Sequence, residues 1–412
     1  MSLDPLPSRN LADQAHTSVK EKNRNKVGPW RCCLNPNEKV GFVLSGGGAR
    51  AAYEVGVLKA MYGGKCPAAK GQNPPEVFCG TGAGAFNAAV IASRLPGQSP
   101  SPVGYLESLW ADEIPREGLT RNNRVYRKRL DTRQFFDLPY MWRRPMKSWV
   151  QYFKDLGFLF PELTARTWKA IVRRNFSSWL NLAIWHDTSP MKRLISESVS
   201  LEIIRDGEND RPQRALRVVA TERGAGQPRI FKNADFSDEI GHDAILASCA
   251  LPIIFPSVDI KGKEYIYGGL VMQAPLQPAV DAGCTVVHLI HNEPKVENRM
   301  PDEEPNTMEM LNRTIAVALS ATLERDLDSR RRVNQLLEAF DRVQNKTSVD
   351  VKPFLADPQN YRRVVVHQYR PKQALGGKTG FLDFSRKAVE ACIAAGERDA
   401  AEHNCVESGC IL

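Results

Sequence analysis

Short apolar runs alternate along the chain with longer segments in which apolar residues recur at helical spacing. The apolar runs predict buried strands at residues 38–47, 75–82, 215–222, 264–269, 284–292 and 362–369. The helical patterns occupy residues 51–64, 85–95, 307–340 and 383–403. Near the start, a strand, a tight turn and a helix follow one another twice in succession, which predicts a parallel sheet covered by helices. The fold class is therefore α/β.

The polar pattern divides the chain into one domain with two flanking segments. Residues 1–37 are polar and unpatterned, so we expect them to be disordered, and residues 401–412 form a C-terminal tail. Between them, residues 38–400 show no internal repeat and no second domain. A chain of 412 residues with 42% hydrophobic residues can bury a full core. No oligomeric state is predicted.

Targeting signals and cysteine spacing bear on where the protein is located and on whether it has disulfides or a metal site. No apolar run of about 18 residues is present and the first residues lack a signal-peptide pattern, so we expect a cytoplasmic protein. The nine cysteines show no CxxC spacing. We therefore expect neither a disulfide framework nor a zinc site, and no metal or other cofactor.

The positive charge is concentrated in one segment. The formal net charge is +9, and residues 121–174 carry 14 Lys and Arg against four acidic residues, which accounts for the whole excess. Five of the seven tryptophans lie in or just beyond this segment: Trp142, Trp149, Trp168, Trp179 and Trp185. Cations interleaved with aromatic residues suit an anionic lipid surface, so residues 121–185 are a candidate for peripheral contact with the inner face of a membrane. The other interpretation, which the composition favours slightly, is a packed helical insert over residues 115–190 with solvated charges. Single-stranded nucleic acid is a weaker alternative that we do not expect.

The second strand ends in a turn with the outline of a nucleophile elbow. In "VFCGTGAGAFNAAV" the turn letters include Gly80, Gly82 and Gly84, and a helix follows. A GxSxG turn of this kind exposes the oxygen of its central serine above the sheet. Here glycine takes that central place, so the small residues are kept and the nucleophile is missing.

The first strand ends in a second glycine-rich turn, "LSGGGARAAYEVGVL". Unpaired amides at the start of the following helix can hold an oxyanion or a phosphate. The residues of this candidate anion-binding turn are Gly46, Gly47, Gly48, Ala49 and Arg50.

Together with "ILASCALPIIFPSVDIKGKEYIYGGLVMQAPLQPAV", these turns make the sequence resemble the patatin-like phospholipase family from about residue 39 to about residue 400. The resemblance implies a three-layer α/β/α fold with a central, mostly parallel sheet, and a Ser-Asp dyad that cleaves acyl esters of glycerolipids. On that pattern the nucleophile position falls on Gly82 and the base position on Tyr267, which is followed by Gly268 and Gly269. Both catalytic side chains depart from the pattern, while the oxyanion turn is kept except that Ala51 replaces its usual last glycine.

Two classes of function follow from this resemblance. In the first, the chain is a catalytically silent relative that binds a lipid or acyl-ester ligand or regulates a partner. In the second, it is an active acyl hydrolase of the phospholipase A or lysophospholipase type, through another nucleophile or as an altered form of a Ser/Asp parent. Gly82 has no side chain, and a phenol with a pKa near about 10 is a poor base, which favours the first. We expect Thr81, Ser45 and Cys79 to be core or turn residues. A nucleotide phosphate site is weaker, because no acidic residue ends a second strand about 20 residues further on.

Overall fold

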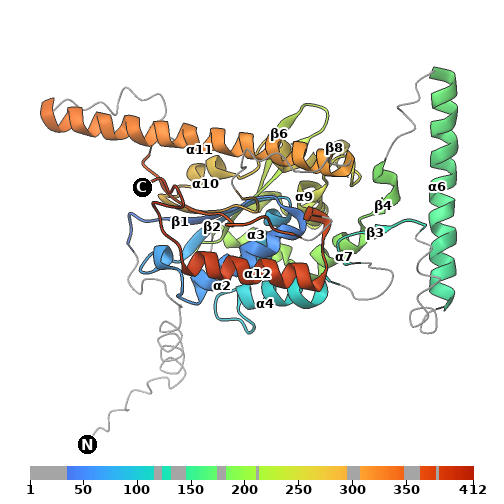
Figure 1. Ribbon diagram of the computed structural model, residues 1–412, viewed down its shortest axis with the longest axis horizontal. Coiled ribbons are helices and arrows are strands. Elements are labelled where there is room, and N and C mark those ends of the chain that lie inside the picture. Colours follow the sequence, from blue (N-terminus) through green and yellow to red (C-terminus); the bar gives the residue numbers. More distant parts are fainter. Residues whose placement is uncertain are drawn as a thin grey trace, which may run out of the picture.

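An eight-stranded sheet lies at the centre of the computed structural model (Figure 1). The described residues are 35–115, 123–130, 145–173, 182–209, 213–294, 307–347, 362–376 and 380–412. Five strands run parallel in the order β10-β9-β1-β2-β5: Val365–Tyr369, Val286–Ile290, Val40–Leu44, Pro75–Thr81 and Ala215–Glu222. Beyond β5 the pairing is antiparallel, through β6 (Gln227–Lys232), β8 (Lys263–Tyr267) and β7 (Val258–Ile260). The expected mostly parallel sheet is confirmed.

The sheet separates two hydrophobic cores, because alternate residues of a strand face opposite sides. On β1, Phe42 and Leu44 belong to the larger core and Val43 to the smaller one. Helices that pack in the larger core are α2 (Ala52–Tyr62), α3 (Ala83–Ala92), α4 (Pro102–Ser108), α7 (Ser189–Ser198), α8 (Leu201–Gly207), α9 (Gly241–Cys249) and α12 (Arg386–Ala401). The smaller core lies under α10 (Leu276–Asp281) and α11 (Thr307–Thr347). Figure 1 shows α10 and α11 on one side of the sheet and α2, α4 and α12 on the other, which is the expected three-layer arrangement.

The segment after α12 packs against the edge of the sheet. The amide of Ile411 donates to the carbonyl of Val366 on β10 at 2.9 Å, and the amide of Val366 donates back to Ile411 at 2.7 Å. Ile411 is buried in the smaller core. The residues predicted as a C-terminal tail therefore cover part of the outer strand.

The basic segment contains a 29-residue helix, α6 (Pro145–Arg173), which stands away from the sheet in Figure 1. Two short strands, β3 (Arg127–Lys128) and β4 (His186–Asp187), pair beside it. The N-terminal segment expected to be disordered lies outside the described residues up to residue 34. Trp142, Trp179 and the side chains of Trp149 and Trp168 also lie outside the described part of the chain. Among the described residues, none of the helices combines the length and the apolar character that a membrane crossing requires.

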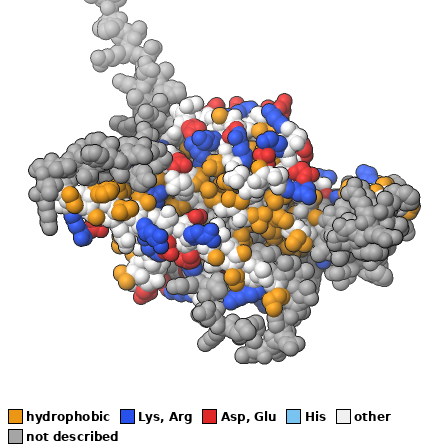
Figure 2. Space-filling model, turned by 90° about the horizontal axis from the view of Figure 1, so that it is seen from above, with side chains coloured by type: hydrophobic (Ala, Val, Ile, Leu, Met, Phe, Trp, Pro, Cys, Tyr) orange, Lys and Arg blue, Asp and Glu red, His pale blue; other side chains and the backbone are white. Residues whose placement is uncertain are grey.

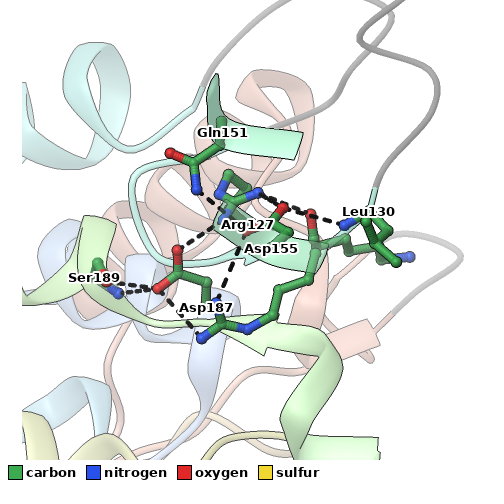
Figure 3. A network of polar contacts seen from close by, with 8 residues as sticks. Arg127, Leu130, Gln151, Asp155, Asp187 and Ser189 are labelled. Atoms are coloured by element: carbon green, nitrogen blue, oxygen red, sulfur yellow. Dashed lines mark hydrogen bonds and ion pairs between the residues drawn. The ribbon is translucent and has the colours of Figure 1, made fainter. Parts of the chain in front are cut away.

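An ion-pair cluster around the buried carboxylate of Asp155 joins α6 to β3 and β4 (Figure 3). The guanidinium of Arg127 donates to both carboxylate oxygens of Asp155, each at 2.7 Å, and to Asp187 at 3.0 Å. The amide of Leu130 and the side chain of Gln151 also donate to Asp155, which is 1% exposed. Burial alone would raise the pKa of Asp155, but the hydrogen bonds and charge of Arg127 lower it below its usual range. We call Arg127, Asp155 and Asp187 the α6 clasp.

Candidate functional site

The sharp turn between β2 and α3 is held in place by hydrogen bonds of the Gly82 main chain. Gly82 has φ 60° and ψ −131°, a backbone conformation that residues other than glycine adopt only with strain. Its amide donates to the hydroxyl of Ser248 at 2.9 Å, and that hydroxyl donates to the carbonyl of Val219 at 2.6 Å. Its carbonyl accepts from the amide of Ala85 at 2.9 Å. The elbow is therefore formed, although its central residue carries no reactive atom.

Tyr267 ends β8 directly beside this elbow. A Cβ atom placed on Gly82 would lie 2.6 Å from the Cε2 atom of the Tyr267 ring, and one placed on Gly46 would overlap the phenol hydroxyl. The hydroxyl donates to Gln273 at 2.8 Å, and the amide of Gln273 donates to the carbonyl of Gly46 at 2.6 Å. Burial raises the pKa of Tyr267 above its usual range, so the phenol stays protonated. The structure thus brings the predicted nucleophile position, base position and anion-binding turn together, with the ring filling the space between them.

The anion-binding turn leads through a short 3₁₀ turn, Gly48–Ala51, into α2. No described residue accepts a hydrogen bond from the amide of Gly47 or Gly48. Arg50 forms an ion pair with Glu293, and both residues line the same pocket as these amides. Ala49 is buried behind the turn. Gly47, Gly48 and Arg50 therefore line a common space with Glu293, and amides and a guanidinium are groups that suit an oxyanion, a carboxylate or a phosphate.

A buried polar network beneath the turn was not predicted from the sequence. The side-chain amide of Asn292 donates to the carbonyl of Ser45 and to Glu54, both at 2.7 Å. Asn87 donates to the other oxygen of Glu54 at 2.7 Å and accepts from the indole of Trp110 at 2.7 Å. Burial raises the pKa of Glu54 to about 8, although the hydrogen bonds from both asparagines lower it in part. The network connects the turn with α2, α3 and the end of β9, and so fixes its position.

The predicted residues line a mostly apolar pocket that is partly open to solvent. From the predicted site it includes Gly46, Gly47, Gly48, Arg50, Gly82 and Tyr267. Its apolar wall contains Phe86, Trp110, Met191, Leu194, Leu251, Phe255 and Phe384. These side chains come from α3, the helical turn after α4, α7, the segment after α9 and the segment before α12, so no single sequence motif indicates them.

The remaining predicted glycines support the site by close packing. A Cβ atom on Gly84 would lie 2.5 Å from the carbonyl of Leu44, and one on Gly80 would lie 2.6 Å from the Ala85 backbone. Gly268 lies against the backbone of β5, and Gly269 against Tyr267 and Gln273. These positions require the absence of a side chain, so their role is to let backbones approach one another.

Other nucleophilic side chains are turned away or unactivated. Thr81 is fully buried and donates to the carbonyl of Met272 at 3.1 Å, while Ser45 is 2% exposed. Burial raises the pKa of Cys79 well above its usual range. Cys249 is the thiol among the described residues that line the pocket, and burial raises its pKa as well. A thiol that is not ionised is a poor nucleophile, so none of these groups is prepared to replace a serine.

Comparisons with known proteins identify the family of the chain. The family model "Patatin-like phospholipase" matches residues 42–280. No curated protein matches the sequence. Solved structures that resemble it include VipD from Legionella pneumophila, with 14% identity and a TM-score of 0.37 over 90% of this chain and 67% of that chain, a similarity too low to support further conclusions. The family match spans more than half of the chain and covers both glycine-rich turns and Tyr267. The chain belongs to the patatin-like phospholipase family.

Proposed function

We propose that this protein is a lipid-binding member of its family in which ester hydrolysis by a Ser-Asp dyad has been lost. The observation that carries the proposal is the ring of Tyr267, which fills the space between Gly82 and Gly46 while the pocket around them persists. A dyad needs a nucleophile and a base at these two places, and the chain offers neither. Binding a lipid or acyl ligand, or regulating a partner through that ligand, needs only the pocket.

The lining of the pocket supports an acyl chain with an anionic or ester head. Phe86, Leu194 and Phe255 belong to the apolar wall, and burying an acyl chain there removes its methylene groups from water. The amides of Gly47 and Gly48 are available to an oxygen at the other end. A fatty acid, a lysophospholipid or a glycerolipid would satisfy both requirements.

Replacing Leu251 with arginine should weaken binding of a fluorescent fatty acid by at least about tenfold, because a charge in an apolar pocket cannot be solvated by the ligand. The matched control is Leu95→Arg, since Leu95 is 41% exposed and does not line the pocket. The measurement is a fluorescence titration with a lipid displacement step. Equal binding by both variants, or no binding by the unchanged chain, would contradict acyl binding in this pocket.

The alternative is an active acyl hydrolase that uses another nucleophile. Cys249 is the candidate, since its thiol lines the pocket. Hydrolysis of a short-chain acyl ester above background that disappears in Cys249→Ser would establish the alternative and overturn the silent proposal. We expect no such rate, because the thiol stays protonated.

We also propose that α6 makes peripheral contact with an anionic membrane. Several apolar side chains of α6 are exposed, and four of them lie on one face of the helix at spacings of three and four residues: Val150, Phe153, Leu156 and Phe160. Asp155 and Leu159, on the opposite face, are buried against the molecule. An exposed apolar face within a basic segment suits insertion among anionic headgroups.

The variant Phe153→Asp/Phe160→Asp should lower binding to vesicles of phosphatidylglycerol and phosphatidylcholine at least about tenfold, because each buried phenyl ring contributes about 1.5–3 kcal/mol. Other exposed apolar residues provide the control. Figure 2 shows hydrophobic side chains gathered on one face of the molecule, and on α11 Leu336 and Val343 are 54% and 47% exposed. Leu336→Asp/Val343→Asp should leave vesicle binding unchanged. Binding that is insensitive to salt and to the acidic lipid content would contradict the proposal.

A further inference from the structure

Two histidines and two cysteines, none of which lines the proposed lipid pocket, meet beside the outer strand of the sheet. His367 lies on β10, and His403, Cys405 and Cys410 lie in the segment that follows α12. One ligand atom from each of the four side chains lies within 4.8 Å of all the others. The Sγ atom of Cys405 is 3.4 Å from Nδ1 of His367 and 3.5 Å from Nε2 of His403, and Sγ of Cys410 is 3.5 Å from the same Nε2.

These separations match the edges of a tetrahedral metal site. With metal to sulfur and metal to nitrogen bonds of about 2.3 and 2.05 Å, tetrahedral angles place sulfur and nitrogen about 3.6 Å apart and two sulfurs about 3.8 Å apart. We propose that His367, His403, Cys405 and Cys410 form a Cys₂His₂ site for a zinc ion. Two thiolates and two imidazoles complete a four-coordinate shell, the set typical of structural zinc, with no position left for a substrate.

The surroundings orient the two imidazoles. The hydroxyl of Ser408 lies 3.3 Å from Nδ1 of His403, which leaves Nε2 directed at both sulfurs. The His403 ring contacts the Tyr369 ring at a tilt of 32°, with 4.5 Å between centroids, and the His367 ring stacks on His288 at 5.2 Å. His403 and Ser408 also line an open hollow at the surface, through which an ion can enter.

A zinc ion here would fasten the end of the chain to the sheet. Three ligands come from the segment that carries Ile411, and the fourth comes from the strand with which Ile411 pairs. The sequence alone gives no such indication, because Cys405 and Cys410 are not in CxxC spacing and His367 is remote from both. The expectation that the chain holds no metal site is therefore replaced by this proposal.

The test uses the full chain, purified with a reductant, stripped with a chelator and titrated with Co²⁺ and then Zn²⁺. We expect one Co²⁺ per chain with thiolate-to-cobalt charge-transfer bands and the intense visible bands of tetrahedral cobalt, all lost when one equivalent of Zn²⁺ is added. The bands should be absent from Cys405→Ser and from Cys410→Ser. They should persist in the controls Cys249→Ser and His242→Asn, which lie outside the cluster.

A second measurement needs no variant and so does not depend on how the variants fold. Zinc should slow alkylation of Cys405 and Cys410 at least tenfold and leave that of Cys249, another partly exposed thiol, unchanged. It should also raise the Tm of the unchanged chain. A reduced chain without cobalt bands, bands that survive in both serine variants, or a Cys405–Cys410 disulfide that forms in place of metal binding would overturn the proposal. Each readout concerns the metal alone, so it is independent of lipid binding.

Discussion

Replacing Gly82 with serine and Tyr267 with aspartate together is expected to give the chain an ester-hydrolysing activity that neither change gives alone. The elbow and the anion-binding turn are both formed, and the two amides of Gly47 and Gly48 are available to an oxyanion. The serine supplies the nucleophile. The aspartate supplies its base and, being smaller than tyrosine, reopens the space that the ring fills.

The matched control for this experiment is Gly82→Ser with Tyr267→Asn, which has the same size but no base. The double variant with aspartate should hydrolyse a short-chain acyl ester about 10² to 10⁴ times faster than this control, the range that a positioned base contributes. The measurement is initial rates on purified, folded proteins, confirmed by circular dichroism. Equal rates for the two variants would mean that the pocket does not hold a dyad in working geometry.

The same substitutions should be coupled in stability. Gly82→Ser alone places a side chain 2.6 Å from the Tyr267 ring and also forces a strained backbone, at a cost of about 1–3 kcal/mol for each effect. In the double variant the first cost disappears and the second remains. A double-mutant cycle of the free energy of unfolding in urea should therefore show a favourable coupling of about 1–3 kcal/mol. Additive changes would show that the ring moves aside freely.

Replacing Arg127 with methionine is expected to release α6 from the rest of the molecule. The change removes the guanidinium that hydrogen-bonds to buried Asp155 and to half-buried Asp187, and leaves the more distant Arg129, 3.9 Å from Asp155 and 4.0 Å from Asp187. Losing one partner of a buried ion pair costs about 3–5 kcal/mol, because the remaining charge stays desolvated. Amide hydrogen exchange over residues 145–173 should accelerate by two orders of magnitude or more, since each 1.4 kcal/mol corresponds to about tenfold.

An exposed ion pair provides the control for the clasp. Arg223 pairs with Glu264, and their side chains are 60% and 49% exposed, so Arg223→Met should change stability by less than about 1 kcal/mol. Exchange in α6 should be unaffected by that variant.

Lowering the pH should accelerate exchange in α6 as Arg127→Met does. The pKa of Asp155 is lowered in the folded protein, so the stability that it contributes is present above its unfolded pKa of about 3.9 and is lost as the pH falls below it. Unchanged exchange in Arg127→Met would show that other contacts hold α6.

The regular strands could be predicted from the sequence because their apolar runs are continuous. All six predicted strands lie in the sheet, since strands buried on both faces leave an unbroken hydrophobic pattern. The sequence missed β6, in which only Phe231 is buried, and β7, which has three residues. Both belong to the antiparallel side, where tertiary pairing and not local pattern decides the conformation.

The two glycine-rich turns of the candidate site could be located from the sequence, but the side chains that contact them could not. Spacing and resemblance placed Gly82 and Tyr267, and the structure brings both positions together. Gln273 could not be predicted, because its contact with Tyr267 depends on the turn after β8. The network of Glu54, Asn87 and Asn292 likewise joins residues that are distant in sequence. Such contacts arise only when the strands have assembled.

The pairing of Ile411 with Val366 bears on how the protein behaves at high concentration. β10 is the outermost parallel strand, and an uncovered outer strand offers its main-chain groups to the strands of other molecules. Ile411 takes both main-chain hydrogen bonds of Val366, so these groups near the start of the strand are already satisfied within the same chain. The terminal segment thus protects the edge strand from pairing with other molecules. A change that detaches this segment should lower the solubility of the protein before it unfolds the domain.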